Sequence, residues 1–231
     1  MSSIKSITSS TAMPLDLAKK IGVDGVNEIL NVFWKAYTEL KKDPAFVVSV
    51  TSEEDDITQK WYEKILEIWD SRNRTTSVTL NGLRPLHQYA DNTMKKRKGA
   101  KAPTIDFCFK DWSTSNSYFG AEAKNLYEDR SDKIHRYVST GVDNYIKGRY
   151  GSQSSESSLI GYVLSGKIAD IVIQLKSEIA KGNPCSNLAR TRNKNPQYSS
   201  SHLRSFDNRE IKLHHLFFDF TSVKRVDTFM H

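Results

Sequence analysis

The sequence contains only two cysteines, Cys108 and Cys185, in 231 residues. They stand in different settings and have no spacing typical of metal ligands. Two cysteines are also too few for the disulfide framework of a small secreted protein. We therefore interpret both as reduced thiols of an intracellular protein, and we expect it to be cytoplasmic.

Long hydrophobic runs are missing as well. None approaches the ~20 apolar residues needed to cross a bilayer, so no membrane association is expected. Residues 1–13 are polar and lack the apolar centre of a signal peptide. Neither GxxxxGK[ST] nor GxGxxG occurs, so the sequence does not support nucleotide-driven chemistry.

Charge is distributed unevenly along the chain. Residues 1–56 carry six Lys and Arg against nine Asp and Glu, whereas the other 175 residues carry 28 against 18. A basic body behind an acidic N-terminal part fits a polyanionic partner such as nucleic acid. Many basic proteins bind no nucleic acid, so the charge alone leaves this open.

The N-terminal third favours helices. Apolar residues at three-to-four spacing predict a helix over residues 15–40, split by Gly22 and Gly25. The run Ser52-Glu53-Glu54-Asp55 has a capping-box pattern and predicts an amphipathic helix that continues to about residue 71.

The rest of the chain alternates between strand and helix patterns. We expect strand segments at 78–80 and 86–89 around Asn81-Gly82 and Pro85, strands at 103–109, 117–124, 159–164 and 211–220, helices at 133–150 and 168–180, and a long loop over 183–207. This order predicts an α/β fold with a mixed central sheet flanked by helices. Residues 1–50 would form a tail and helical extension, and residues 51–231 the main domain.

Asp106 and the triplet Glu122-Ala123-Lys124 are the most informative residues, because each lies inside an apolar strand-like run. Residues two apart on a strand share a face, so Glu122 and Lys124 point the same way. A hairpin between the two runs would bring Asp106 alongside them. Two carboxylates and an ammonium suit a divalent cation and a phosphodiester. The alternative is an ordinary strand ion pair beside an exposed acid.

These residues resemble the motif of the PD-(D/E)xK nuclease superfamily. The chain has Pro103-Thr104-Ile105-Asp106, fifteen intervening residues, and then Glu122-Ala123-Lys124, with the proline three positions before the aspartate. The resemblance covers roughly residues 52–220. It implies a restriction-endonuclease-like core and an endonuclease that hydrolyses phosphodiester bonds with Mg²⁺ or Mn²⁺.

The resemblance also implies roles for individual residues. Asp106, Glu122 and the carbonyl of Ala123 would hold the metal ion, and Lys124 would orient or deprotonate the attacking water. Glu54 stands where many members carry another acid and could hold a second metal or a water, with Glu53 and Asp55 as nearby alternatives. DNA is favoured over RNA, and the resemblance suggests a bacterial role in restriction or anti-phage defence. Many such enzymes work as dimers, so the resemblance implies a homodimer or an activating protein partner.

Two basic segments are candidates for phosphate contacts: Lys95, Lys96, Arg97 and Lys98, and later Lys147 and Arg149. Basic loops supply affinity without reading sequence. The first segment also fits a solvated loop or a nuclear-import signal. Each interpretation depends on the nuclease hypothesis.

The main alternative is a nuclease-like fold that binds nucleic acid or assembles with a partner without catalysis. Phe33, Trp34 and Tyr37 could dock such a partner, although their helical spacing favours a place in the core. Arg209 and His214 have the spacing of a helical ribonuclease motif, but residues 211–220 alternate like a strand. For the same reason His214 and His215 should face opposite ways, which does not suit zinc binding.

Overall fold

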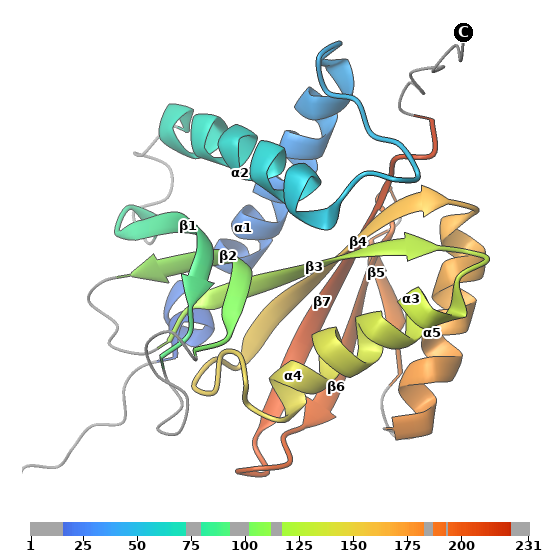
Figure 1. Ribbon diagram of the computed structural model, residues 1–231. Helices are drawn as coiled ribbons and strands as arrows, with labels where there is room; N and C mark the ends of the chain where they lie inside the picture. The colour runs from blue at the N-terminus through green and yellow to red at the C-terminus, as the bar shows by residue number, and fades with distance from the viewer. Residues whose placement is uncertain are drawn as a thin grey trace, which may run out of the picture.

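A seven-stranded mixed sheet forms the centre of the protein, and helices cover both of its faces (Figure 1). The computed structural model describes residues 16–72, 80–92, 102–111, 117–182, 187–192 and 194–222. The elements in chain order are α1 (Leu17–Lys42), α2 (Glu54–Ser71), β1 (Leu83–Ala90), β2 (Thr104–Asp111), β3 (Phe119–Tyr127), α3 (Ser131–Arg136), a π-helical turn (Tyr137–Val142), α4 (Asp143–Ile146), β4 (Glu156–Ser165), α5 (Ile168–Gly182), β5 (Ala189–Arg192), β6 (Gln197–Leu203) and β7 (Glu210–Asp219).

The strand order is β1-β2-β3-β4-β7-β6-β5. The pairs β3–β4 and β4–β7 are parallel, and the remaining pairs are antiparallel. Strand β4 therefore lies at the centre with both faces buried, as the continuous apolar run over 159–164 predicted. The predicted α/β class with a mixed sheet is confirmed.

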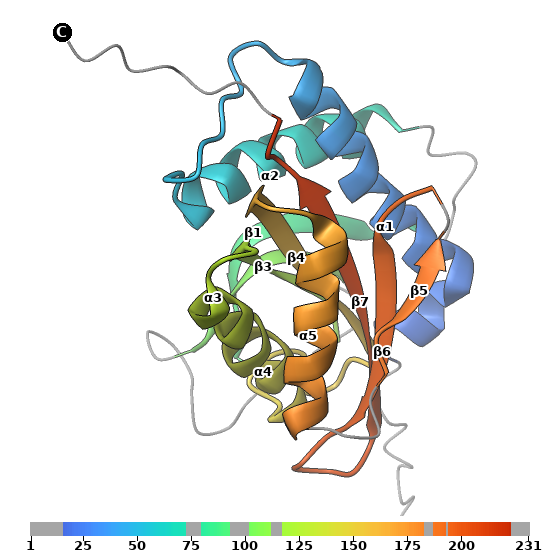
Figure 2. The ribbon, with the colours of Figure 1, turned by 90° about the vertical axis from the view of Figure 1, so that its right-hand side faces the viewer.

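One core lies on each face of the sheet. Helices α1 and α2 cover one face, and α3 to α5 cover the other; Figure 2 shows α1 and α5 separated by β6 and β7. On the α1 side, the ring of Phe33 packs edge-on against Phe107 and Phe109, at centroid distances of 5.3 and 5.7 Å. Trp34 and Tyr37 pack on Phe218. The core interpretation of these aromatics is confirmed, and the domain boundary at residue 50 stays a prediction.

Helix α1 is interrupted at Gly22, whose φ of 68° lies in the left-handed region that glycine tolerates. The predicted split is confirmed there but not at Gly25, which is helical and packs against Ile21. The predicted capping box is wrong. Helix α2 begins at Glu54 after Glu53, which makes no capping hydrogen bond with its side chain, and the Ser52 hydroxyl instead accepts the amide of Ser49 at 2.9 Å.

Pro85 does not break a strand, contrary to the prediction. It lies inside β1, an edge strand, where a missing backbone donor is tolerated. Of the predicted segment 78–80, residues 78 and 79 lie outside the described residues, and Leu80 is not in a strand. The predicted helix over 133–150 runs instead from Ser131 to Ile146 and contains the π-helical turn.

The prediction of a long loop over 183–207 is wrong, because this segment contains β5 and β6. Strand β6 pairs antiparallel with β7 along its whole length, from Gln197 opposite Leu216 to Leu203 opposite Glu210. The predicted strand over 211–220 is confirmed as β7. Within the described residues, no helix combines the length and the apolar character needed to cross a membrane.

Candidate active site

The candidate site lies where β2 separates from β3. The two strands pair from Phe109 opposite Phe119 to Phe107 opposite Ala121, and the pairing ends there. The residues that follow Ala121 in β3 pair with β4 on one side and leave the other edge open. On β1, Gln88 stands opposite Asp106 and adopts a left-handed φ of 48°, while the β1–β2 register continues without a shift.

Carboxylates cover the backbone amides of this open edge. The Ala123 amide donates to Oδ2 of Asp106 at 2.7 Å, and the Asn125 amide donates to Oε2 of Glu54 at 3.0 Å. Glu54 comes from the first turn of α2, so the helix and β2 together replace a neighbouring strand. The side chain of Asn125 fixes this arrangement by donating to the carbonyl of Ser52 at 3.0 Å.

The ammonium of Lys124 joins these acids. It lies 2.7 Å from Oε1 of Glu122, 3.0 Å from Oε1 of Glu54 and 2.5 Å from the carbonyl oxygen of Ala123. Lys124 and Glu122 are only 5% and 6% exposed. The structure therefore brings together all five residues that the sequence placed at the site, Glu54, Asp106, Glu122, Ala123 and Lys124.

Negative charge exceeds positive charge in this buried cluster, because three carboxyl groups face one ammonium. Burial, reinforced by Asp106 and opposed by Lys124, raises the pKa of Glu122 from 4.5 to about 8. Burial also raises the pKa of Asp106 from 3.8 to about 6, against the attraction of Lys124 and the Ala123 amide. Burial alone would lower the pKa of Lys124, but Glu122, Glu54 and Asp106 outweigh it and raise the value.

One carboxylate oxygen at the site lacks a hydrogen-bond partner. Oε2 of Glu122 is buried and has no hydrogen-bond partner within the part of the chain that the structure describes. A buried acceptor without a partner is costly unless a proton, water or cation satisfies it. The hydroxyl of Tyr150 approaches the other oxygen at a long 3.5 Å. Burial, with the nearby charge of Glu122, raises the pKa of Tyr150.

The donor set fits a hard divalent cation in its chemistry. Asp106, Glu122 and the Ala123 carbonyl supply oxygen atoms of the type that Mg²⁺ and Mn²⁺ prefer. The unsatisfied oxygen of Glu122 and the excess negative charge agree with such a cation. In the described ranges no group of three or more His, Cys, Asp or Glu side chains is arranged around a ready-made metal position. The Lys124 ammonium instead contacts two of the predicted ligands.

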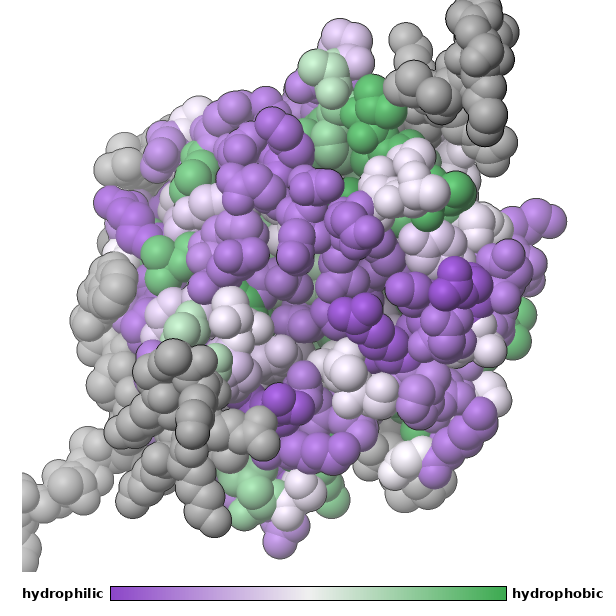
Figure 3. Space-filling view, viewed as in Figure 1, coloured by the Kyte–Doolittle hydropathy of each residue, from purple (hydrophilic) through white to green (hydrophobic). Residues whose placement is uncertain are grey.

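The predicted phosphate contacts are only partly described. Lys95, Lys96, Arg97 and Lys98 lie outside the described residues. Lys147 and Arg149 are both exposed, on the segment that follows α4 and leads to Tyr150, so they lie close in sequence to a residue of the site. Lys147 also pairs with Asp143 at 2.6 Å. In Figure 3 the surface over α2, and between α2 and α4, is mainly hydrophilic.

Sequence reasoning missed Asn125 and Tyr150, because their roles depend on where α2 and the segment after α4 pack. Glu53 and Asp55, the alternatives to Glu54, are exposed. Arg209 and His214 belong to β7 and its preceding turn, and His214 pairs with Glu156 at 2.7 Å. No protein-family model, curated protein or solved structure matches the chain.

Proposed function

We propose that this protein is a metal-dependent nuclease that hydrolyses phosphodiester bonds in nucleic acid, with DNA favoured over RNA. The observation that carries the proposal is the buried cluster of Glu54, Asp106, Glu122 and Lys124 on the open edge of β3. An isolated strand ion pair would not require three acids around one ammonium. Nor would it raise the pKa of Glu122 to about 8.

Each residue of the cluster has a role in hydrolysis that follows from its chemistry. Asp106, Glu122 and the carbonyl of Ala123 would hold Mg²⁺ or Mn²⁺, which supplies a Lewis acid for the phosphoryl group and lowers the pKa of a bound water. Lys124 would carry positive charge at the phosphate and orient the attacking water. Glu54, which contacts both Lys124 and the Asn125 amide, would keep the ammonium beside the reacting group.

The proposal extends to a restriction-endonuclease-like core, to action as a homodimer or with an activating partner, and to restriction or anti-phage defence. These features rest on the resemblance of the motif. The order of the elements and the antiparallel pair β2–β3 that carries the motif support the first of them. Lys147 and Arg149 are the described candidates for phosphate contacts.

A cleavage assay tests the proposal. Plasmid, linear duplex, single-stranded DNA and RNA are incubated with Mg²⁺, Mn²⁺ or EDTA. Wild type is compared with Asp106→Asn and Lys124→Ala, and with Asp129→Asn and Lys176→Ala as matched charge controls outside the cluster. Asn at position 106 retains an oxygen that accepts the Ala123 amide, so loss of activity there reports on charge rather than on folding.

Metal-dependent cleavage that both site variants abolish and both controls retain would support the proposal and identify the substrate. If the site variants cut as well as wild type, the site assignment is wrong. If folded wild type binds nucleic acid but cleaves none of these substrates with either metal, the non-catalytic alternative is favoured. In that case the Lys124 cluster is a self-contained ion network.

A further inference from the structure

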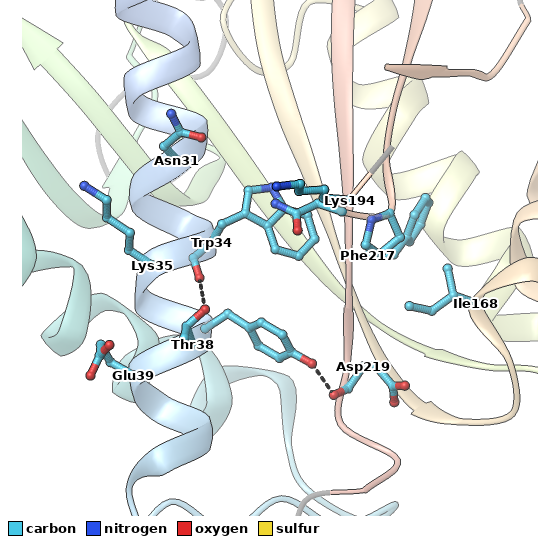
Figure 4. Close-up of a pocket in the computed structure, with 12 residues that line it drawn as sticks. Asn31, Trp34, Lys35, Thr38, Glu39, Ile168, Lys194, Phe217 and Asp219 are labelled. Carbon is cyan, nitrogen blue, oxygen red and sulfur yellow. Dashed lines mark hydrogen bonds between the residues drawn. The ribbon is translucent and has the colours of Figure 1, made fainter. Parts of the chain in front are cut away.

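A second concave site lies between α1 and the end of β7. It is a cavity of 570 Å³, which is within the usual range for small-molecule sites. It exists because β6 begins only at Gln197, opposite Leu216, so β7 extends beyond its neighbour by three residues. The C-terminal half of α1 and the start of α5 form the two walls (Figure 4).

Two aromatic side chains of α1, Trp34 and Tyr37, line the inner part of this cavity. Tyr37 is half-buried and Trp34 is 9% exposed, whereas Phe217 of β7, which also borders the cavity, is fully buried. Their orientations are fixed by the protein itself. The Trp34 indole donates to Oε1 of Gln197 at 3.1 Å, and the Tyr37 hydroxyl donates to the backbone carbonyl of Asp219 at 2.6 Å. A flat apolar group would find preformed walls here at little entropic cost.

The cavity carries opposite charges at its two ends. Asp219 lies at the end next to Tyr37, whose hydroxyl donates to its backbone carbonyl, and Oδ1 of the Asp219 carboxylate accepts the amide and hydroxyl of Thr221. Lys194 is exposed on the opposite side, near Trp34, and within the described chain it forms no ion pair. Lys35 also lines the rim, but Figure 4 shows its side chain pointing away. Lys194 is thus the cation best placed for an anionic group.

We propose that this cavity binds a nucleotide whose base carries an amino group. The base would pack on the aromatic walls, its amino group would donate to Asp219, and its phosphate would contact Lys194. Aspartate is a suitable acceptor for the exocyclic amine of cytosine, and lysine is a common phosphate ligand. A fully apolar ligand would leave both charged groups unused, and a simple anion would leave the aromatic walls unfilled.

The site is separate from the candidate active site but lies at the same level of the sheet. Lys124 is opposite Gly161 on β4, and Gly161 is opposite Phe217 on β7. With strands about 4.8 Å apart, the Cα atoms of Lys124 and Phe217 are about 10 Å apart. The nucleotide could therefore be a free molecule or an unstacked base of a bound nucleic acid, and the chemistry of recognition is the same.

Calorimetric titration in EDTA tests the proposal without any cleavage. AMP, CMP, GMP and UMP are titrated into wild type, Lys194→Ala, Asp219→Asn and the control Lys176→Ala. CMP should bind more tightly than UMP, since the two differ in the amino group. Lys194→Ala should weaken CMP binding about tenfold, as expected for one charge-assisted hydrogen bond, and Asp219→Asn should reduce the preference for CMP. Asp106→Asn should bind as wild type does, which separates this result from the nuclease proposal.

A single-stranded oligonucleotide and versions with one abasic position form the second arm. Binding of mononucleotides that depends on Lys194 and Asp219 supports the free nucleotide as ligand. If one abasic position weakens binding of the oligonucleotide to wild type but not to Lys194→Ala or Asp219→Asn, the ligand is a base of a bound nucleic acid. If mononucleotides give no saturable heat at millimolar concentration and abasic positions have no effect, the proposal is wrong. Binding unaffected by both variants also refutes it.

Discussion

Glu122 should make the metal-free protein lose stability as pH rises, and the structure gives the size of the effect. Its pKa rises from 4.5 to about 8 on folding, mainly through burial. The folded protein therefore binds more protons than the unfolded chain between these values. The contribution of Glu122 is complete below pH 4.5 and is lost as pH rises through 8. The free energy of unfolding should fall by about 1.4 kcal/mol per pH unit.

The window from pH 6 to pH 8 contains a large part of the Glu122 effect, and the buried His202 and His215, whose pKa values are lowered, contribute there with the opposite sign. Asp106, whose pKa rises to about 6, has its main effect at lower pH, and the raised pKa of Lys124 lies above the window. Glu122 should then account for a loss of roughly 2 kcal/mol between pH 6 and pH 8, because the slope flattens as the carboxyl becomes half ionised near pH 8. Guanidinium unfolding in EDTA at half-unit intervals measures it, with Glu122→Gln as the control that cannot titrate.

The difference between the two proteins removes the contribution of every other titrating group. Wild type should lose stability relative to Glu122→Gln as pH rises. If Glu122 holds the metal ion as proposed, Mg²⁺ should stabilise wild type more at pH 8 than at pH 6, because protons compete with the metal for this carboxylate. Parallel curves for wild type and Glu122→Gln would refute the reasoning. They would mean that Glu122 ionises in the folded protein as it does in the unfolded chain.

Three other substitutions test the packing around the site and the adjacent loop by guanidinium unfolding. Lys124→Met should destabilise the fold by about 3–5 kcal/mol at pH 8, because it leaves buried carboxylates unpaired. The loss should be smaller at pH 5, where these carboxylates take up protons, and an equal loss at both pH values would contradict this. Gly161→Ala should cost about 1–3 kcal/mol, because its Cβ would lie 2.5 Å from the side chain of Leu126. An unchanged guanidinium midpoint would show that the neighbouring side chains can move to accommodate the methyl group. Arg204→Met should cost about 2–4 kcal/mol, since the buried guanidinium donates to three carbonyls within residues 151–154, and a loss below 1 kcal/mol would mean that water replaces it.

Local patterns predicted most elements of the fold because their periods are strong. Strand β4 was visible as an unbroken apolar run, and β2, β3 and β7 as apolar or alternating segments. Strands β5 and β6 were missed because Arg dominates the short sequence of β5 and Ser that of β6, and pairing with β7 rather than propensity makes β6 a strand. Pro85 led to the opposite error, a predicted break inside a real strand, because a proline is tolerated in β1 only through the position of that strand at the edge of the sheet.

The capping pattern at residues 52–55 failed for a related reason. Ser52 is used in the turn that precedes α2, where its hydroxyl accepts the Ser49 amide and its carbonyl accepts the side chain of Asn125. That second bond joins the start of α2 to β3. The first turn of the helix is thus fixed by tertiary contacts, and these contacts also place Glu54 against Lys124 and the Asn125 amide.

The residue types of the site were readable from the sequence, but its state of charge was not. Asp106, Glu122 and Lys124 stand out because acids and lysines are rare inside apolar strands. Their coupling depends on the point at which β2 separates from β3, which no local pattern specifies. At that point the backbone of Ala123 has no neighbouring strand on the β2 side, so its amide turns to Asp106 and its carbonyl to the Lys124 ammonium. The Lys124 ammonium thus takes the place of a strand donor at this edge, and the excess of carboxyl groups around it appears as the raised pKa of Glu122.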